Sequence, residues 1–303
     1  MSEAPVPRPP LLDPLLVAKL ATMELRARYV VEGALAGRHR SVRQGHSLEF
    51  TGHRSYTPSD EWRHIDWRVF AKTDRWVVRE QQEETNLRAV VLMDVSRSML
   101  FAGPRRLPKI QYAALLSAAL AYLLVHRRES VGLGFFNRGL MSFVPPRGGA
   151  EHLSRLFGLL EAVSGDGGTD LGASLEEAGQ RLPRRCLVVL VSDFLEPPES
   201  VLSAVRTLVT RKHEVVALQV LDPAERDLPF EGDFVFEDLE TGAVLRANAD
   251  ELRGHYRRKM EERLQLTARA FHSAAVDAHL FWTDAPLESG LSLFLQKRLA
   301  RRT

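Results

Sequence analysis

The chain has 303 residues, of which 45% are hydrophobic and 26% charged, a composition typical of a globular protein with one large domain or two smaller ones. The formal net charge of +2 gives no overall attraction for nucleic acid or for a membrane surface. A single cysteine, Cys186, excludes an internal disulfide and a cysteine-rich zinc site. No signal peptide is recognisable at the N-terminus, and we expect a reducing, cytoplasmic location.

The first part of the chain falls into two segments. Residues 1–14 are rich in proline and are expected to form a flexible N-terminus. Residues 15–86 are predicted to form an N-terminal subdomain, with a helix from about Leu15 to Leu35. The rest of this subdomain is dense in glycine, arginine, histidine and aromatic residues.

Strands and helices alternate through residues 87–303. Continuous aliphatic runs such as Val188–Val191 are typical of strands buried on both faces. The alternation predicts an α/β fold with a doubly wound, mainly parallel sheet, interrupted by an inserted hairpin over residues 222–248. Strands are expected at Arg88–Met93, Val131–Phe136, Leu140–Phe143, Cys186–Val191, Glu214–Leu221 and Val276–Phe281, and helices at Lys109–Arg127, Ala150–Val163, Asp170–Arg181, Pro198–Arg211, Ala249–Ser273 and from Leu287.

The longest apolar stretch lies within the first of these helices. Tyr112–Val125 is too short to cross a bilayer, which takes about 20 apolar residues. We therefore expect a buried core helix and no transmembrane segment.

Oxygen-bearing side chains follow the first buried strand of this region. Asp94, Ser96 and Ser98 stand at alternate positions, and side chains at such positions share one side of an extended segment. Carboxylate and hydroxyl oxygens suit a hard divalent cation such as Mg2+ rather than zinc.

Two further segments are expected to bring oxygens to the same sheet edge. The loop Gly165–Asp170 is rich in glycine and contains Thr169, and Ser192 and Asp193 directly follow another strand. Each segment alone has an ordinary explanation as a helix cap, a turn or a polar strand end, which we favour for any one of them taken singly. Their occurrence together and in this order favours a common site.

This constellation resembles the von Willebrand factor A domain with its metal-ion-dependent adhesion site. The resemblance implies that Ser96 and Ser98 ligate Mg2+ (or Mn2+ or Ca2+) directly and that Thr169 ligates it directly or through water. It also implies that Asp94 and Asp193 act through bound waters, which leaves a coordination position for an acidic side chain of a protein ligand. Arg97 stands where many members carry glycine, and it either tunes ligand choice or points to solvent.

The N-terminal subdomain carries a pattern formed by Gly52, Arg54, Tyr56, Asp60, Arg63, Ile65–Trp67, Ala71–Lys72 and Glu83–Glu84. This pattern resembles the segment that precedes such a domain in a MoxR-associated bacterial family, domain of unknown function family 58. The resemblance implies a MoxR-type AAA+ ATPase as partner. That partner would carry the ATPase activity, because this chain has no phosphate-binding GxxxxGK[ST] loop. The alternating charges and tryptophans of the segment favour a salt-bridged small domain, and the alternative is a second docking surface that includes Arg54, Arg63 and Trp67.

We therefore expect a non-enzymatic interaction module, an adaptor or co-chaperone of the ATPase. One alternative is a Mg2+-dependent hydrolase of phosphoesters, which would need an acid two residues after Asp94, where Ser96 stands. The other alternative is a structural assembly protein with an incidental metal. The basic runs lie on predicted helices and are read as solvated faces, so no nucleic-acid partner is expected.

Overall fold

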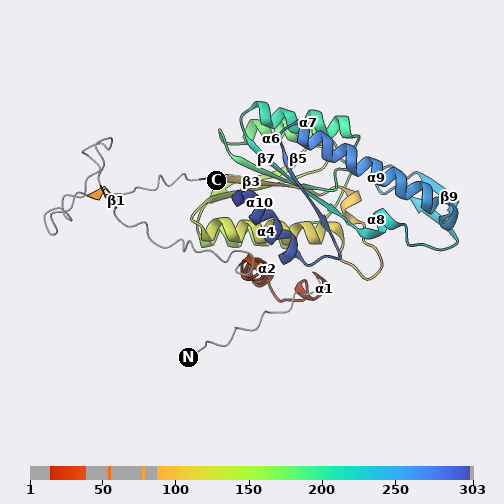
Figure 1. The fold of residues 1–303 in the computed structure, drawn as a ribbon, viewed down its shortest axis with the longest axis horizontal. Coiled ribbons are helices and arrows are strands. Elements are labelled where there is room, and N and C mark those ends of the chain that lie inside the picture. The colour runs from red at the N-terminus through yellow and green to blue at the C-terminus, as the bar shows by residue number, and fades with distance from the viewer. Residues whose placement is uncertain (1–13, 39–53, 56–76, 79–86, 301–303) are drawn as a thin grey trace. The chain divides into compact units, whose positions relative to one another are not determined.

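The computed structural model describes residues 14–38, 54–55, 77–78 and 87–300 (Figure 1). Its contacts divide the chain into two compact units, one of residues 1–40 and 87–303 and the other of residues 41–86. In the smaller unit the described residues form two short antiparallel strands, β1 (Arg54–Ser55) and β2 (Val77–Val78).

The larger unit is built on a six-stranded sheet in the order β10-β7-β6-β3-β4-β5. All neighbouring strands are parallel except β4 and β5. The predicted doubly wound, mainly parallel sheet is therefore confirmed. The strands are β3 (Arg88–Asp94), β4 (Ser130–Phe136), β5 (Leu140–Arg147), β6 (Leu187–Ser192), β7 (Glu214–Leu221) and β10 (Asp277–Trp282).

The chain changes direction across the sheet between two adjacent strands. From β3 it proceeds outward to β4 and β5, and it then returns to β6 on the other side of β3. In open sheets of this kind, ligands bind beyond the carboxyl ends of the strands at such a reversal. The crevice between the ends of β3 and β6 is therefore the place where the fold favours a site.

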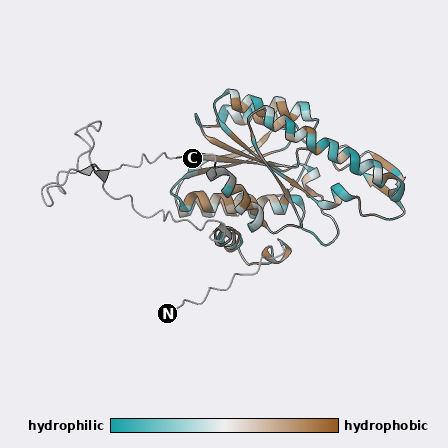
Figure 2. Cartoon of the chain, viewed as in Figure 1, coloured by the Kyte–Doolittle hydropathy of each residue, from teal (hydrophilic) through white to brown (hydrophobic). Residues whose placement is uncertain are grey.

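Helices cover both faces of the sheet (Figure 1). One core contains the β3 side chains Val91 and Met93, and the other contains Val90 and Leu92, as the alternation of a strand requires. Figure 2 shows the strands as largely hydrophobic and α9 as more hydrophilic along its length. The first face carries α2 (Met23–Arg38), α4 (Lys109–His126), α5 (Ala150–Glu161) and α10 (Leu287–Ala300), and the second carries α6 (Leu171–Arg181), α7 (Pro198–Thr210) and α9 (Ala249–Ser273).

Helix α4 is apolar nearly all round. By length and composition it is the one helix among the described residues that could cross a membrane, and 72% of that stretch is buried inside the unit. Its burial is that of a core helix.

The helix expected at the start of the N-terminal subdomain, residues 15–86, packs instead with the helices of the larger unit. Helix α2 packs on α4 and α10 and belongs to the larger unit, preceded by the short α1 (Pro14–Val17). Its buried face consists of Ala27, Val30, Val31 and Ala34, spaced as i, i+3, i+4 and i+7. This periodicity predicts a helix but does not say which core the helix joins.

Residues 222–248 contain more than the expected hairpin. The strands β8 (Asp233–Glu237) and β9 (Val244–Asn248) pair antiparallel, but a short helix, α8 (Pro223–Asp227), precedes them. Asp222 and Glu225 form a reciprocal capping box and Pro223 occupies the first turn, which stabilises this single helical turn.

Candidate functional site

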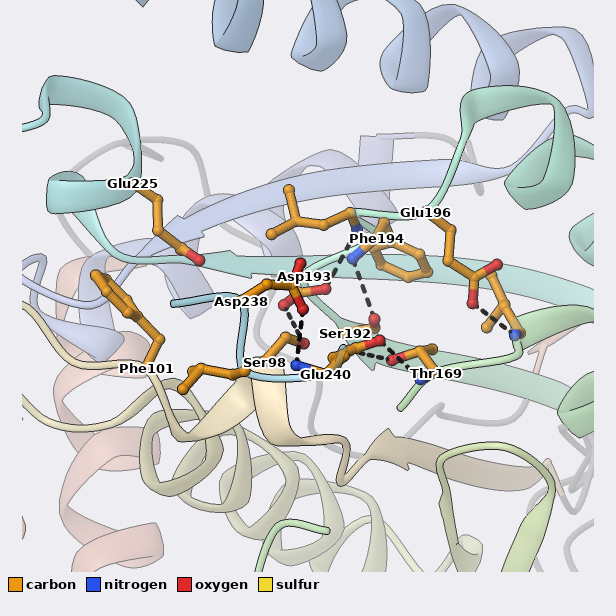
Figure 3. A pocket seen from close by; sticks show the side chains of 13 residues that line it. Ser98, Phe101, Thr169, Ser192, Asp193, Phe194, Glu196, Glu225, Asp238 and Glu240 are labelled. Atoms are coloured by element: carbon orange, nitrogen blue, oxygen red, sulfur yellow. Dashed lines mark hydrogen bonds between the residues drawn. The ribbon is translucent and has the colours of Figure 1, made fainter. Parts of the chain in front are cut away.

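A pocket lies at the carboxyl ends of β3 and β6, at the reversal of the strand order (Figure 3). The predicted residues Ser98, Thr169 and Asp193 line it, together with Glu196, Glu225 and Glu240. Oxygen atoms from four separate parts of the chain therefore meet at this edge of the sheet.

Asp94 forms the buried floor behind this pocket. It is the last residue of β3 and has no exposed surface. Its Oδ1 accepts a hydrogen bond from the Ser96 amide at 2.9 Å, and its Oδ2 accepts one from Ser192 Oγ at 2.6 Å. Burial, and then the negative charge of Asp193, raise the pKa of Asp94 well above its ordinary value.

The two serines converge, although the chain does not continue as a strand. Ser96 is extended, but a 3-10 turn, η2 (Arg97–Leu100), begins at the next residue. The expectation that Asp94, Ser96 and Ser98 project together from an extended segment is therefore wrong in its geometry. The turn itself brings Ser96 Oγ to 3.0 Å from Ser98 Oγ.

Asp193 links these serines to the neighbouring strand. Its Oδ2 accepts a hydrogen bond from Ser98 Oγ at 2.8 Å. The next residue, Phe194, has a φ of +50°, so the chain turns sharply and Asp193 Oδ1 accepts a bond from the Leu195 amide at 3.2 Å. Gln219 on β7 donates its side-chain amide to the Asp193 carbonyl at 2.8 Å. The turn after β3 thus holds the side chain of Asp193, and β7 holds its carbonyl group.

A buried lysine shares the Asp193 carboxylate. Lys109, the first residue of α4, has no exposed surface, and its Nζ lies 2.7 Å from Asp193 Oδ2 and 2.5 Å from Glu225 Oε1 on α8. Burial by itself lowers the pKa of Lys109, but the charges of Asp193 and Glu225 outweigh burial and raise it. The site therefore contains a fixed positive charge.

The glycine-rich loop reaches the same edge. The Arg97 amide donates to the Gly167 carbonyl at 2.9 Å, and the Asp166 amide donates to the Val95 carbonyl at 2.9 Å. Asp170 accepts from the Ala173 amide and caps α6, which is one of the ordinary roles considered for this loop.

Thr169 contacts the inserted hairpin rather than the serines. Its Oγ1 donates to Glu240 Oε1 at 3.0 Å and its amide donates to Glu240 Oε2 at 3.1 Å (Figure 3). Thr169 thus lines the pocket, and its hydroxyl points to a carboxylate that the sequence did not single out.

The residues named as candidates for partner binding belong to different units of the chain or fall outside the described residues. Arg97 is about half exposed and lies 3.3 Å from Asp166 Oδ1, a surface ion pair. Arg54 lies in β1 opposite Val78. Arg63 and Trp67 fall outside the described residues.

The donor set of the pocket consists of oxygens. Within residues 14–38, 54–55, 77–78 and 87–300, no three side chains of histidine, cysteine, aspartate or glutamate are placed to hold a metal. The five predicted ligands differ from such a group, because two are carboxylates (Asp94 and Asp193) and three are hydroxyls. The site holds one ammonium group, that of Lys109, which pairs with Asp193 and Glu225. Two further carboxylates, those of Asp94 and Glu240, accept hydrogen bonds from Ser192 and Thr169. This excess of negative charge and the all-oxygen donors fit a hard divalent cation.

Sequence reasoning missed three charged residues of the site. Lys109 opens a helix that is otherwise apolar, and such an isolated charge can signal a buried partner. Glu225 stands three residues after Asp222 in a capping-box spacing. Glu240 lies in a turn between two strands, and no sequence pattern marks it as a site residue. It reaches the site only because of where the hairpin lies.

Comparison with known proteins places the chain among uncharacterised bacterial relatives. It is 32% identical to the Uncharacterized protein Rv1480 of Mycobacterium tuberculosis and to the Uncharacterized protein Mb1516 of Mycobacterium bovis, in each case over 284 residues, 91% of this chain and 85% of the relative. Among solved structures, the conserved hypothetical protein BatB from Bacteroides thetaiotaomicron is similar with a TM-score of 0.48 and 18% identity, over 70% of this chain and 98% of that one. The VWA domain of SpRpn10 is similar with a TM-score of 0.39 and 10% identity, over 68% and 93% of the two chains.

The fold class of this chain is assigned from its strand order, and its family is assigned from its sequence. The pattern of the family described as protein of unknown function DUF58 matches residues 52–265. The chain therefore belongs to the DUF58 family.

Proposed function

We propose that this protein is a non-enzymatic interaction module that binds an acidic side chain of a partner protein through a divalent metal ion. The observation that carries the proposal is the continuous set of oxygens at the reversal of the strand order. Ser96, Ser98 and Asp193 are joined at 3.0 and 2.8 Å, and Asp94 lies behind them with no exposed surface.

The residues that would hold the ion are those named from the resemblance. Ser96, Ser98 and Thr169 would supply hydroxyl oxygens, and Asp94 and Asp193 would act through water. Bound Mg2+ would supply a positive centre to which a further carboxylate can bind. The chain's own part is to fix these oxygens, which it does through the Ser96 amide, the Ser192 hydroxyl and Lys109.

The burial of Asp94 disfavours the hydrolase alternative. A nucleophilic carboxylate must reach its substrate, but Asp94 has no exposed surface and both of its oxygens accept hydrogen bonds. The residue two positions later is Ser96, which offers no general acid.

We further propose that the protein acts in the cytoplasm as an adaptor or co-chaperone of a MoxR-type AAA+ ATPase. The resemblance of the N-terminal segment supports this pairing. The ATPase would hydrolyse ATP, and this chain would recognise the protein on which the pair acts.

Affinity capture from the native cell tests the proposal. The wild-type chain, Ser98→Ala and the control Ser142→Ala, an exposed serine on β5, are used as baits in Mg2+ and in EDTA. We expect wild type and the control to capture a protein, either the ATPase or a client, in Mg2+ and to lose that protein in EDTA. Ser98→Ala should fail to capture the same protein in Mg2+ as well as in EDTA. Capture at full strength in EDTA contradicts the metal bridge and favours an assembly role with an incidental metal.

A further inference from the structure

We propose that Glu240 is an internal carboxylate ligand of this site, which occupies the place of a partner's acidic side chain and must withdraw before a partner binds. This inference rests on the proposed function and adds to it the regulation of the same site. The segment Asp238–Glu240, between strands β8 and β9, lines the pocket (Figure 3).

Both oxygens of Glu240 are engaged by one residue of the predicted ligand set. Thr169 donates its hydroxyl to Oε1 at 3.0 Å and its amide to Oε2 at 3.1 Å, across 71 positions of sequence. The carboxylate therefore lies beside a predicted direct or water-mediated ligand, which is where an incoming acidic side chain would bind.

The glycine-rich loop leaves room for this carboxylate. A Cβ atom on Gly168 would lie 3.2 Å from Glu240 Oε2, tighter than ordinary van der Waals contact. A side chain at position 168 would therefore require the Glu240 carboxylate to shift by a few tenths of an ångström.

The turn that carries Glu240 is preorganised. Asp238 Oδ1 accepts hydrogen bonds from the amides of Glu240 at 2.9 Å and Thr241 at 2.7 Å, and these bonds lower the pKa of Asp238. Gly242 has a φ of +71°, and its amide donates to the Asp238 carbonyl at 2.8 Å. The turn therefore holds the Glu240 backbone in place before the carboxylate binds.

The charges around Glu240 make its position depend on a cation. No ion pair among the described residues includes Glu240, and its carboxylate accepts hydrogen bonds there from one hydroxyl and one amide. The guanidinium of Arg138 lies beside Gly168, near the same carboxylate, without forming an ion pair with it. Asp193, Glu196 and Glu225 line the same pocket, and the negative charge of Glu240 contributes to the raised pKa of Glu196, after burial and the charge of Asp170. A divalent ion would turn this repulsion into attraction.

The hairpin buries little apolar surface beyond one aromatic cluster. Phe234 and Phe236 pack with Phe230, whereas Val235, Val244 and Leu245 are each about 60% exposed. An isolated two-stranded hairpin is marginally stable in water. Its contacts at the other end are with the start of α9, where the Gly232 amide donates to Asp250 Oδ2 at 2.8 Å. Release of Glu240 would therefore free the tip without unfolding the sheet.

The first test measures hydrogen exchange of the full chain in Mg2+. We expect Glu240→Gln to speed exchange of the Thr169 amide, which donates to the Glu240 carboxylate, about tenfold, a loss of about 1.4 kcal/mol of local protection. The control Glu237→Gln removes the same charge from an exposed position of β8 and should exchange as wild type. Equal exchange in Glu240→Gln and wild type overturns the inference.

The second test uses N-acetylglutamate as a carboxylate probe, followed by NMR at saturating Mg2+. Glu240→Gln should bind the probe about fivefold more tightly than wild type or Glu237→Gln, because its internal competitor is gone. If all three bind it equally and Ser98→Ala binds none, the inference fails while the proposed function stands. If wild type binds neither Mg2+ nor probe, both fail.

Discussion

Lys109 places a positive charge among the carboxylates of the site. Its ammonium has no exposed surface and bridges Asp193 and Glu225 at 2.7 and 2.5 Å. Breaking a buried ion pair leaves an uncompensated charge in a poorly solvated place, which is more costly than the pair is favourable. Lys109 therefore matters to stability as well as to the position of Asp193.

The variant Lys109→Met should lower the free energy of unfolding by about 3–5 kcal/mol, because it leaves two buried carboxylates without their cation. Urea unfolding measures the effect. Lys259→Met, which removes a lysine from an exposed pair on α9, should leave the unfolding midpoint unchanged. A loss in Lys109→Met as small as in that control contradicts the structural role of Lys109.

The burial of Cys186 is a property that the sequence does predict. Its apolar surroundings predict a buried, unreactive thiol, and the structure places it 2% exposed. Burial raises the pKa of the thiol to about 11, so the reactive thiolate is scarce at pH 8.

We therefore expect no reaction of Cys186 with an aromatic disulfide reagent at pH 8 in the native protein, and one equivalent of reaction in urea. Rapid labelling of the folded protein contradicts the assignment.

At the scale of elements, the sequence predicts that most of the helices and strands exist. It does not predict the short turns that form between them. The run Lys109–Arg127 is expected as a helix, and α4 spans Lys109–His126. The turn at Arg97–Leu100 is not predicted, because no local signal distinguishes a strand that continues from one that turns to form hydrogen bonds with a distant loop. Helix α8 is not predicted for a different reason, since its five residues form a single turn with a capping box at the start of a segment whose polar alternation indicates a hairpin.

Asp170 allows the roles of capping and metal binding to be separated. Asp170→Ala should cost about 0.5–2 kcal/mol of stability by removing the cap of α6. Mg2+ affinity should stay close to that of wild type, because Asp170 is not among the predicted ligands. A loss of affinity as large as that of Ser98→Ala would show that this loop residue does more than cap the helix.

At the scale of the whole molecule, the sheet order explains why distant segments share one site. Chain reversal between β3 and β6 brings together Asp94 and Asp193, which are 99 positions apart in the sequence. The strand–helix alternation of the sequence predicts the parallel sheet but not the order of its strands. The place of the hairpin over this edge does not follow from that alternation. It depends on contacts between Thr169 and Glu240, which no local periodicity encodes.

The metal is the central claim, and calorimetric titration of the full chain with Mg2+ tests it most directly. Wild type and Ser142→Ala should bind one equivalent, and Ser98→Ala should bind at least about tenfold more weakly, because it loses a direct ligand while the fold remains. Absence of Mg2+ binding by wild type, or equal binding by wild type and Ser98→Ala, would contradict the account.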